Sequence, residues 1–173
     1  ISYEGIQYQY MSPVVFSEDA LEYVQKHLRI LSGFYGILKP FDGVTPYRLE
    51  MQAKASIGNY RDLYDYWGSD LYEQLTLDDD QVILNLASKE YSKCIEKYLQ
   101  PKDCYITCVF AELIDGKAVQ KGTLAKMARG EMVRYLAENK IEDLEGVKNF
   151  CGLGYEFSES LSKEHEYVFI KRA

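Results

Sequence analysis

The chain has 173 residues, of which 47% are hydrophobic and 27% are charged, and this composition is typical of a globular protein with a substantial core. Its formal net charge is −7 and its pI is about 4.9, a balance that argues against a general polyanion-binding protein. No apolar run approaches the roughly 20 residues that a membrane-spanning helix needs, so we expect no membrane partner.

The first predicted elements are a strand and a helix. Residues Ile1–Met11 alternate loosely between apolar and polar side chains, so we expect a strand that enters a turn. Ser17 is a suitable helix N-cap, and acidic residues fill the turn that follows it, where they favour the positive end of the helix dipole. This helix should end at Lys26 or His27.

The segment Leu28–Met51 is rich in glycine and proline. It predicts a strand at Leu28–Leu31, two tight turns and a second strand at Tyr47–Met51. On such a strand Arg48 and Glu50 share one face. This pair is a candidate for phosphate binding or for catalysis, with Glu50 as a general base or metal ligand, and the alternative is a structural ion pair.

Three further elements are predicted in the middle of the chain. Apolar side chains recur at helical spacing over Arg61–Leu75, which indicates a second helix. The acidic triplet Asp78–Asp80 is typical of a loop. The apolar run Val82–Leu86 predicts a buried strand, and Ser88 after it is the expected N-cap of a short helix through Ile95.

The start of that short helix is a candidate anion site. Backbone N–H groups at a helix N-terminus attract phosphates, and Asn85 and Ser88 would add hydrogen bonds to the bound group. The alternative is that Ser88 only caps its own helix. Arg29, in the preceding strand, is a further candidate phosphate ligand.

The last part of the chain combines strands with the longest predicted helix. A strand at Tyr105–Ile114 is followed by Asp115-Gly116, a strong hairpin signal, and Thr123–Asn139 predicts a helix. Gly154–Phe157 and Tyr167–Ile170 predict two antiparallel closing strands. The fold class is therefore α/β (mixed α+β), with a mixed sheet and flanking helices in a single domain. We expect the following side chains to be largely buried: Trp67, Leu84, Leu86, Phe110 and Tyr155.

Basic residues cluster on and near the Thr123–Asn139 helix. Between Lys117 and Asn139 five basic residues face two acidic ones, and a tight connection then leads into a short helix that ends near Phe150. Such a helix–hairpin–helix layout presents amides and cations to a phosphate backbone, whereas the alternative is a solvated cationic face. The candidate contacts are Lys121, Lys126, Arg129 and Arg134.

Established enzyme motifs are absent from the sequence. It contains no GxGxxG, Walker-type, GxSxG or HExxH pattern. The four cysteines form no CxxC pair, and only two histidines occur, so we expect reduced thiols, no metal site and no cofactor.

Six separated motifs resemble those of one family, the YaaA-like peroxide-stress proteins, which are bacterial cytoplasmic proteins. The motifs are Leu28–Gly36, Pro46–Met51, Asp62–Gly68, Ile83–Tyr91, Ala128–Arg134 and Gly154–Phe157. Because the chain starts at Ile1, it resembles the C-terminal two-thirds of the family, and we expect the N-terminal third to lie outside it.

The resemblance implies a function that the residue patterns alone do not. It implies one α/β domain with a positively charged cleft and a helix–hairpin–helix element. It also implies binding to double-stranded or structured DNA and a protective role in peroxide stress that limits iron-driven damage, exerted in the cytoplasm and without turnover of a substrate. The alternative function is an enzyme acting on a nucleotide or another phosphorylated small molecule, with Arg29 and Arg48 clamping the anion beside Glu50.

Overall fold

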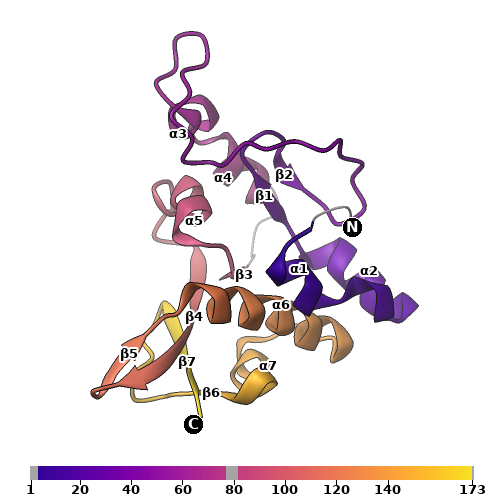
Figure 1. The fold of residues 1–173 in the computed structure, drawn as a ribbon, viewed down its shortest axis with the longest axis vertical. Helices are drawn as coiled ribbons and strands as arrows, with labels where there is room; N and C mark the ends of the chain where they lie inside the picture. The colour runs from indigo at the N-terminus through magenta and orange to yellow at the C-terminus, as the bar shows by residue number, and fades with distance from the viewer. Residues whose placement is uncertain (1–3, 77–81, 173) are drawn as a thin grey trace. The chain divides into compact units, whose positions relative to one another are not determined.

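The computed structural model describes residues 4–76 and 82–172 (Figure 1). The chain forms two compact units. The first unit combines residues 1–28 with 106–173, and the second unit consists of residues 29–105. The single-domain arrangement stays a prediction.

The first unit contains a mixed sheet, as predicted. Its helices are α1 (Ile6–Met11), α2 (Glu18–His27), α6 (Gly122–Glu138) and α7 (Leu144–Lys148), with short 3-10 turns at Pro13–Val15 and Gly152–Gly154. Its strands are β4 (Cys104–Ile114, whose first two residues belong to the second unit), β5 (Lys117–Val119), β6 (Tyr155–Phe157) and β7 (Glu166–Lys171). β7 pairs in parallel with β4 and antiparallel with β6, and β5 pairs antiparallel with β4.

Local signals predicted several of these elements correctly. Asp115 and Gly116 both have positive φ, 51° and 73°, and they join β4 to β5 in the two-residue turn that an Asp-Gly pair favours. Ser17 Oγ accepts a hydrogen bond from the Ala20 backbone N at 3.2 Å, which confirms the N-cap of α2. The predicted helix Thr123–Asn139 corresponds to α6.

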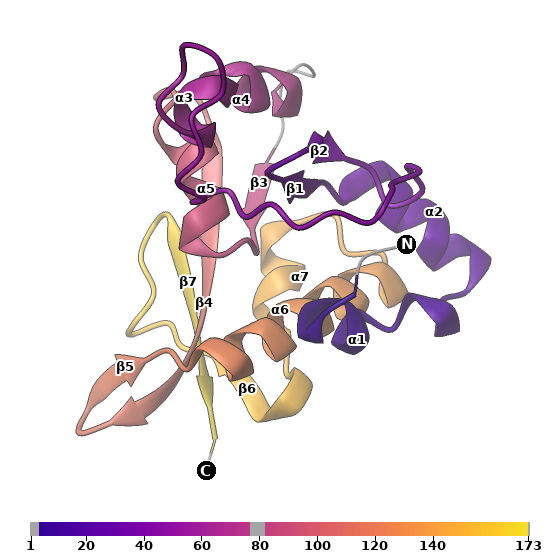
Figure 2. The ribbon, with the colours of Figure 1, turned by 45° about the horizontal axis from the view of Figure 1, so that its top comes forward.

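The predicted strand at Ile1–Met11 is wrong in its described part, because Ile6–Met11 form α1. α1 and α2 both pack against α6 (Figures 1 and 2). The approach of α1 is so close that a Cβ on Gly130 would lie 2.0 Å from the Gln7 carbonyl oxygen. Packing against a distant helix therefore decides the conformation of a segment whose local alternation is weak.

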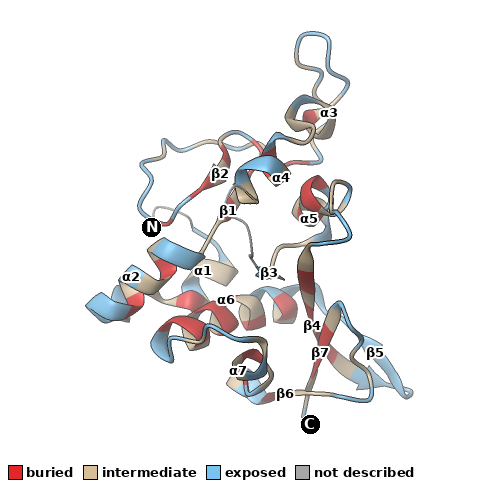
Figure 3. Cartoon of the chain, turned by 180° about the vertical axis from the view of Figure 1, so that it is seen from behind, coloured by how far each residue is buried: buried red, intermediate tan, exposed pale blue. Residues whose placement is uncertain are grey.

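The core of the first unit is an aromatic cluster beneath α6 and α7. Phe110 stacks on Phe169 with ring centroids 5.3 Å apart, and Tyr155 and Phe150 contact Phe110 edge-on. All four side chains are at most 1% exposed, and such edge-on contacts add to the free energy gained by burying each ring. Figure 3 shows buried residues along α6 and an exposed β4–β5 hairpin tip.

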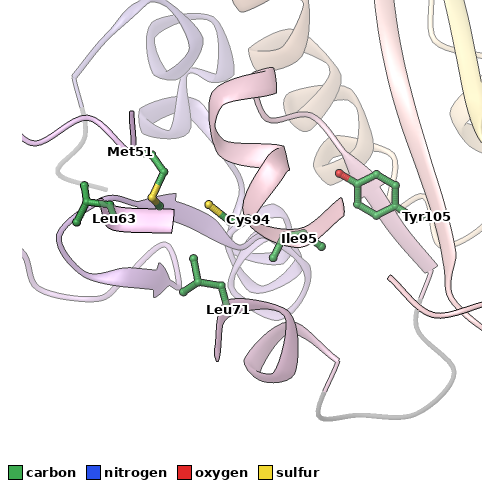
Figure 4. Packing of buried hydrophobic residues seen from close by; sticks show 6 residues of the cluster. All are labelled: Met51, Leu63, Leu71, Cys94, Ile95 and Tyr105. Carbon is green, nitrogen blue, oxygen red and sulfur yellow. The ribbon is translucent and has the colours of Figure 1, made fainter. Parts of the chain in front are cut away.

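The second unit packs short helices around its own core. Its elements are β1 (Ile30–Ser32), β2 (Gly36–Leu38), α3 (Leu63–Trp67), α4 (Asp70–Leu75), β3 (Val82–Asn85) and α5 (Lys89–Glu96). β1 and β2 form an antiparallel hairpin. The buried side chains of the core come from α3, α4, α5, the start of β4 and the segment before α3 (Figure 4): Met51, Leu63, Leu71, Cys94, Ile95 and Tyr105.

Three element predictions in the second unit need correction. The strand expected at Leu28–Leu31 lies at Ile30–Ser32. Tyr47–Met51 is not a strand, because residues 43–50 run without ladder pairing. The single helix expected at Arg61–Leu75 is two helices, α3 and α4, because Gly68 adopts φ 48° and ψ −130° and interrupts the helical path.

The burial predictions are confirmed for Phe110 and Tyr155. Trp67, Leu84 and Leu86 are intermediate in burial, and none of them is exposed. Trp67 packs against the core of the second unit. In β3 the buried residue at the end of the strand is Asn85, at 7% exposure, and its amide oxygen accepts a hydrogen bond from the Ala87 N at 2.9 Å. The Trp67 Nε1 donates a hydrogen bond to the Gly33 carbonyl oxygen. The predicted loop Asp78–Asp80 lies outside the described residues.

Candidate functional site

The helix α6, together with its N-cap residue Lys121, carries the predicted basic residues of the first unit. Its buried side includes Ala125, Ala128 and Met132, so the remaining positions are left for polar side chains. Lys126 is exposed and forms no ion pair within the described ranges 4–76 and 82–172. It is therefore an available cation.

Two of the four predicted cations are already neutralised. Lys121 Nζ lies 2.5 Å from a carboxylate oxygen of Glu112, and Arg134 Nε lies 2.9 Å from a carboxylate oxygen of Glu138, one helical turn away. The Glu138 hydrogen bond raises the pKa of Arg134 above its usual value. These pairings reduce the positive field that either residue presents to a phosphate.

Arg129 differs from the other three, because its charge is partly buried. Its Nε is buried and has no hydrogen-bond partner, and it makes no ion pair with any carboxylate in the described part of the chain. Burial lowers the pKa of the guanidinium, an effect that the neighbouring Cys108 opposes. Arginine nonetheless stays protonated in proteins near neutral pH.

The Cys108 thiol does not supply a counter-charge for Arg129. Cys108 is 2% exposed, and burial raises the pKa of its thiol to about 12, although Arg129 acts to lower it. The thiol is therefore neutral at pH 7. A partly desolvated guanidinium with an unsatisfied buried N–H is costly to leave without a partner. The buried Nε is closed to an external ligand, so an oxyanion could offset the cost only through the terminal guanidinium N–H groups.

The predicted pair of Arg48 and Glu50 lies in the second unit. Both residues are exposed on an irregular segment, and no ion pair joins them within the described residues. The expectation that they share a strand face is wrong, because no strand forms there. Glu50 does lie close enough to Tyr91 to affect the pKa of its hydroxyl. Burial is the main cause that raises this pKa to about 12, and Glu90, Tyr47 and Glu50 raise it further, whereas a backbone hydrogen bond from Met51 lowers it.

Asn85 and Ser88 flank the start of α5, as predicted. The Asn85 amide oxygen is engaged by the Ala87 backbone N. The Ser88 side chain makes no capping hydrogen bond to its own helix. The alternative that Ser88 only caps this helix is therefore not supported. Arg29 is half-buried and directly precedes β1.

Glu90 has a positioning role that the sequence patterns did not indicate. Its carboxylate accepts a hydrogen bond from the Gln52 backbone N at 3.2 Å, and its backbone carbonyl accepts one from Tyr64 Oη at 2.9 Å. Both contacts join segments that are far apart in the sequence, so local patterns could not predict them. The one local signal for a role of Glu90 is that this carboxylate follows the N-cap residue of α5.

A hollow of about 450 Å³ in the second unit is lined by Tyr64, Lys93, Cys94, Glu96, Lys97 and Tyr98, none of which is among the predicted site residues. No group of three or more His, Cys, Asp or Glu side chains that could hold a metal ion occurs in the part of the chain that the structure describes. No helix of these described residues is long and apolar enough to cross a membrane.

Comparison with known proteins gives one family. A family model described as "Peroxide stress protein YaaA" matches residues 1–161. The UPF0246 protein of Agathobacter rectalis is 60% identical over 172 residues, which cover 99% of this chain and 69% of that relative.

Similar values are found for proteins of other bacteria. The UPF0246 protein of Limosilactobacillus reuteri is 59% identical over 169 residues, which cover 98% of this chain and 68% of the relative. That of Pediococcus pentosaceus is 52% identical over 171 residues, covering 99% and 68%. The chain thus spans about two-thirds of the length of these relatives.

Proposed function

This chain belongs to the family of peroxide stress protein YaaA, and from this premise we propose that it binds DNA through the basic residues of α6. The partner is double-stranded or structured DNA. The cellular role is protection during peroxide stress by limiting iron-driven oxidative damage, exerted in the cytoplasm and without turnover of a substrate.

The observation that carries the proposal is the state of Arg129. The chain is acidic overall, at −7, so DNA affinity must come from a local site rather than from net charge. Arg129 is half-buried, and Nε is its only nitrogen that is fully buried without a partner, so a phosphate oxygen would contact the terminal guanidinium N–H groups, which donate hydrogen bonds in a fixed fork. The exposed Lys126, one helical turn before Arg129, adds a second charge.

The four cations of α6 are therefore not equivalent. Arg129 and Lys126 are the principal phosphate ligands, whereas Lys121 and Arg134 contribute less because Glu112 and Glu138 neutralise them. The α6–α7 pair, joined by the short connection at residues 139–143, serves as the helix–hairpin–helix element that positions these side chains against the phosphate backbone.

The test is equilibrium binding of the full chain to a fluorescent DNA duplex at low salt. Arg129→Gln is expected to weaken binding by about tenfold or more, since a charge-assisted hydrogen bond contributes about 1.5–3 kcal/mol. Arg134→Gln is the matched control on the same helix and should weaken binding much less. Absence of any duplex binding by the unmodified chain at low salt would reject the proposal.

A second function is favoured by one observation in the second unit. Glu50 lies close enough to Tyr91 to help raise the pKa of its hydroxyl, and a carboxylate beside a hydroxyl group is suited to proton transfer. On this proposal the chain acts on a nucleotide or another phosphorylated small molecule bound by Arg29 and Arg48. Incubation with a nucleotide mixture, followed by chromatography, should then give a product that Glu50→Gln abolishes. An unchanged mixture would discard this second function.

A further inference from the structure

Three aromatic side chains cluster at the β1–β2 turn of the second unit, with Phe34 exposed and Tyr35 and Tyr47 partly buried. The Phe34 ring centroid lies 4.8 Å from that of Tyr35 and 5.4 Å from that of Tyr47. The planes of Phe34 and Tyr47 differ by 32°, whereas Tyr35 stands nearly perpendicular to both. Phe34 remains 56% exposed, so much of this large apolar ring is in contact with water.

Hydrogen bonds hold the two tyrosines of this aromatic cluster in place. Ser32 Oγ lies 2.5 Å from Tyr47 Oη and accepts hydrogen bonds from the backbone N of Phe34 and of Tyr35. Tyr35 Oη lies 2.9 Å from Thr45 Oγ1. The tyrosine rings are thus fixed at both ends, and Phe34 is displayed on a turn that Ser32 closes.

The backbone of the turn is fixed as well. The Gly33 carbonyl accepts a hydrogen bond from Trp67 Nε1 at 3.1 Å. A Cβ on Gly33 would lie 2.8 Å from the Leu49 carbonyl oxygen, so the segment before α3 passes directly against the turn. Phe34 therefore cannot enter the core without disrupting these contacts, and a rigid exposed ring is a pre-organised binding surface.

The chain segment that carries this cluster has a net charge opposite in sign to that of the whole chain. Residues 29–54 contain four basic and two acidic side chains, a net of +2 within a chain of net −7. Arg48, the neighbour of Tyr47 in sequence, is exposed, as is Lys39. A partner with planar aromatic groups on an anionic backbone matches both features.

We propose that Phe34 and Tyr47 stack on an unpaired base of DNA, with Arg48 contributing attraction to the adjacent phosphate. The inference rests on the proposed DNA-binding function and adds a preference for DNA that contains unpaired nucleotides. Bases inside a duplex are covered by their neighbours, so an exposed aromatic ring gains little from paired DNA, whereas every unpaired base offers a free face.

The test compares a single-stranded oligonucleotide of about 15 nucleotides with a duplex of the same length, each titrated against the full chain. Phe34→Ala should weaken single-strand binding about fivefold or more, because each stacked base contributes about 1–3 kcal/mol, and should leave duplex binding unchanged. Phe41→Ala is the matched control, since Phe41 is 54% exposed in the same segment but lies outside the cluster. Phe34→Trp should keep single-strand affinity, and its added fluorescence should be quenched by the oligonucleotide.

The outcomes separate this inference from the function on which it rests. If the unmodified chain binds both DNAs but Phe34→Ala changes neither, the stacking role is wrong and DNA binding stands. Equal losses for single strand and duplex, or equal losses for Phe34→Ala and Phe41→Ala, also overturn the stacking role. If the unmodified chain binds neither DNA, both proposals fail together.

Discussion

At the scale of single residues, Gly130 is the glycine at which an added Cβ would lie closest to another atom. It lies within the Ala-Arg-Gly motif of α6, and a Cβ there would be 2.0 Å from a backbone oxygen of α1. The glycine is thus needed for helix–helix approach rather than for an unusual φ. The packing of α1 therefore explains why the residue next to Arg129 is a glycine. This explanation does not depend on any ligand that Arg129 binds.

Gly130→Ala should therefore lower the free energy of unfolding by about 1–3 kcal/mol, the usual cost of overpacking. The backbone of α1 would have to move as a whole, because no flexible side chain can give way. Urea denaturation followed by circular dichroism measures the change. Gly122→Ala is the control on the same helix, since nothing lies within 4 Å of its added methyl group. Equal stability of the two variants would contradict this packing.

Tyr23 links stability to alkaline pH. Its Oη donates to the Ile141 carbonyl, and burial, with a smaller contribution from Glu142, raises the pKa of its hydroxyl to about 12. The unfolded chain loses this proton near the ordinary pKa of about 10, before the folded chain does. Stability from this group is thus complete below pH 10 and is lost as the pH rises from 10 to 12.

The Tyr23→Phe variant isolates this contribution. The free energy of unfolding should fall less steeply between pH 10 and pH 12 in the variant than in the unmodified chain, by up to one proton in the linkage slope. Denaturant titrations at a series of pH values give both slopes. Identical slopes would show that Tyr23 ionises equally easily in the folded and unfolded chain.

At the scale of elements, the sequence predicts those with strong local signals. The Asp-Gly turn, the Ser17 cap and the long α6 are confirmed because each depends on residues close together in sequence. The strand expected at Tyr47–Met51 does not form, because a strand needs a pairing partner and no described residue pairs with this segment. The strand expected at Ile1–Met11 is wrong for a related reason: the described part of this segment forms α1, and its packing partner, α6, is more than a hundred residues away in the sequence.

Gly68 decides the division of one expected helix into α3 and α4. Its φ of 48° and ψ of −130° are strongly unfavourable for a residue with a Cβ. Gly68→Ala should lower the free energy of unfolding by about 1–3 kcal/mol, measured by thermal or urea unfolding. The control is Gly43→Ala, at a site with open space and no positive φ. A neutral Gly68→Ala would mean that α3 and α4 can join into the single helix that the apolar stripe predicts.

At the scale of the whole molecule, the sequence indicates which residue types matter but not how they are paired. Lys121, Lys126, Arg129 and Arg134 look alike in sequence, and only the structure separates the paired from the available cations. The carboxylate of Glu112 that neutralises Lys121 comes from β4, across the hairpin. The aromatic cluster around Phe34 also escaped prediction, because it depends on Tyr47 returning to a turn that lies more than ten residues earlier.

The iron effect implied by the resemblance should not arise from tight metal binding by this chain. The described residues contain no cluster of three metal-ligating side chains, although Asp78–Asp80 lie outside them. We expect ferrous iron to bind no more tightly than about 1 mM, or on the order of −4 kcal/mol. Anaerobic calorimetry measures this directly. A saturable micromolar site would refute the expectation, and Cys104 and Cys108 would be the first residues to substitute.

The most direct test of DNA binding through Arg129 is the salt dependence of duplex affinity. The logarithm of the binding constant should fall linearly with the logarithm of salt concentration, by about 0.9 per neutralised phosphate. Arg129→Gln should make this slope shallower by about 0.9, while Arg134→Gln leaves it nearly unchanged because Glu138 already pairs with Arg134. A slope that Arg129→Gln does not alter, or that Arg134→Gln alters more, would contradict the role assigned to Arg129.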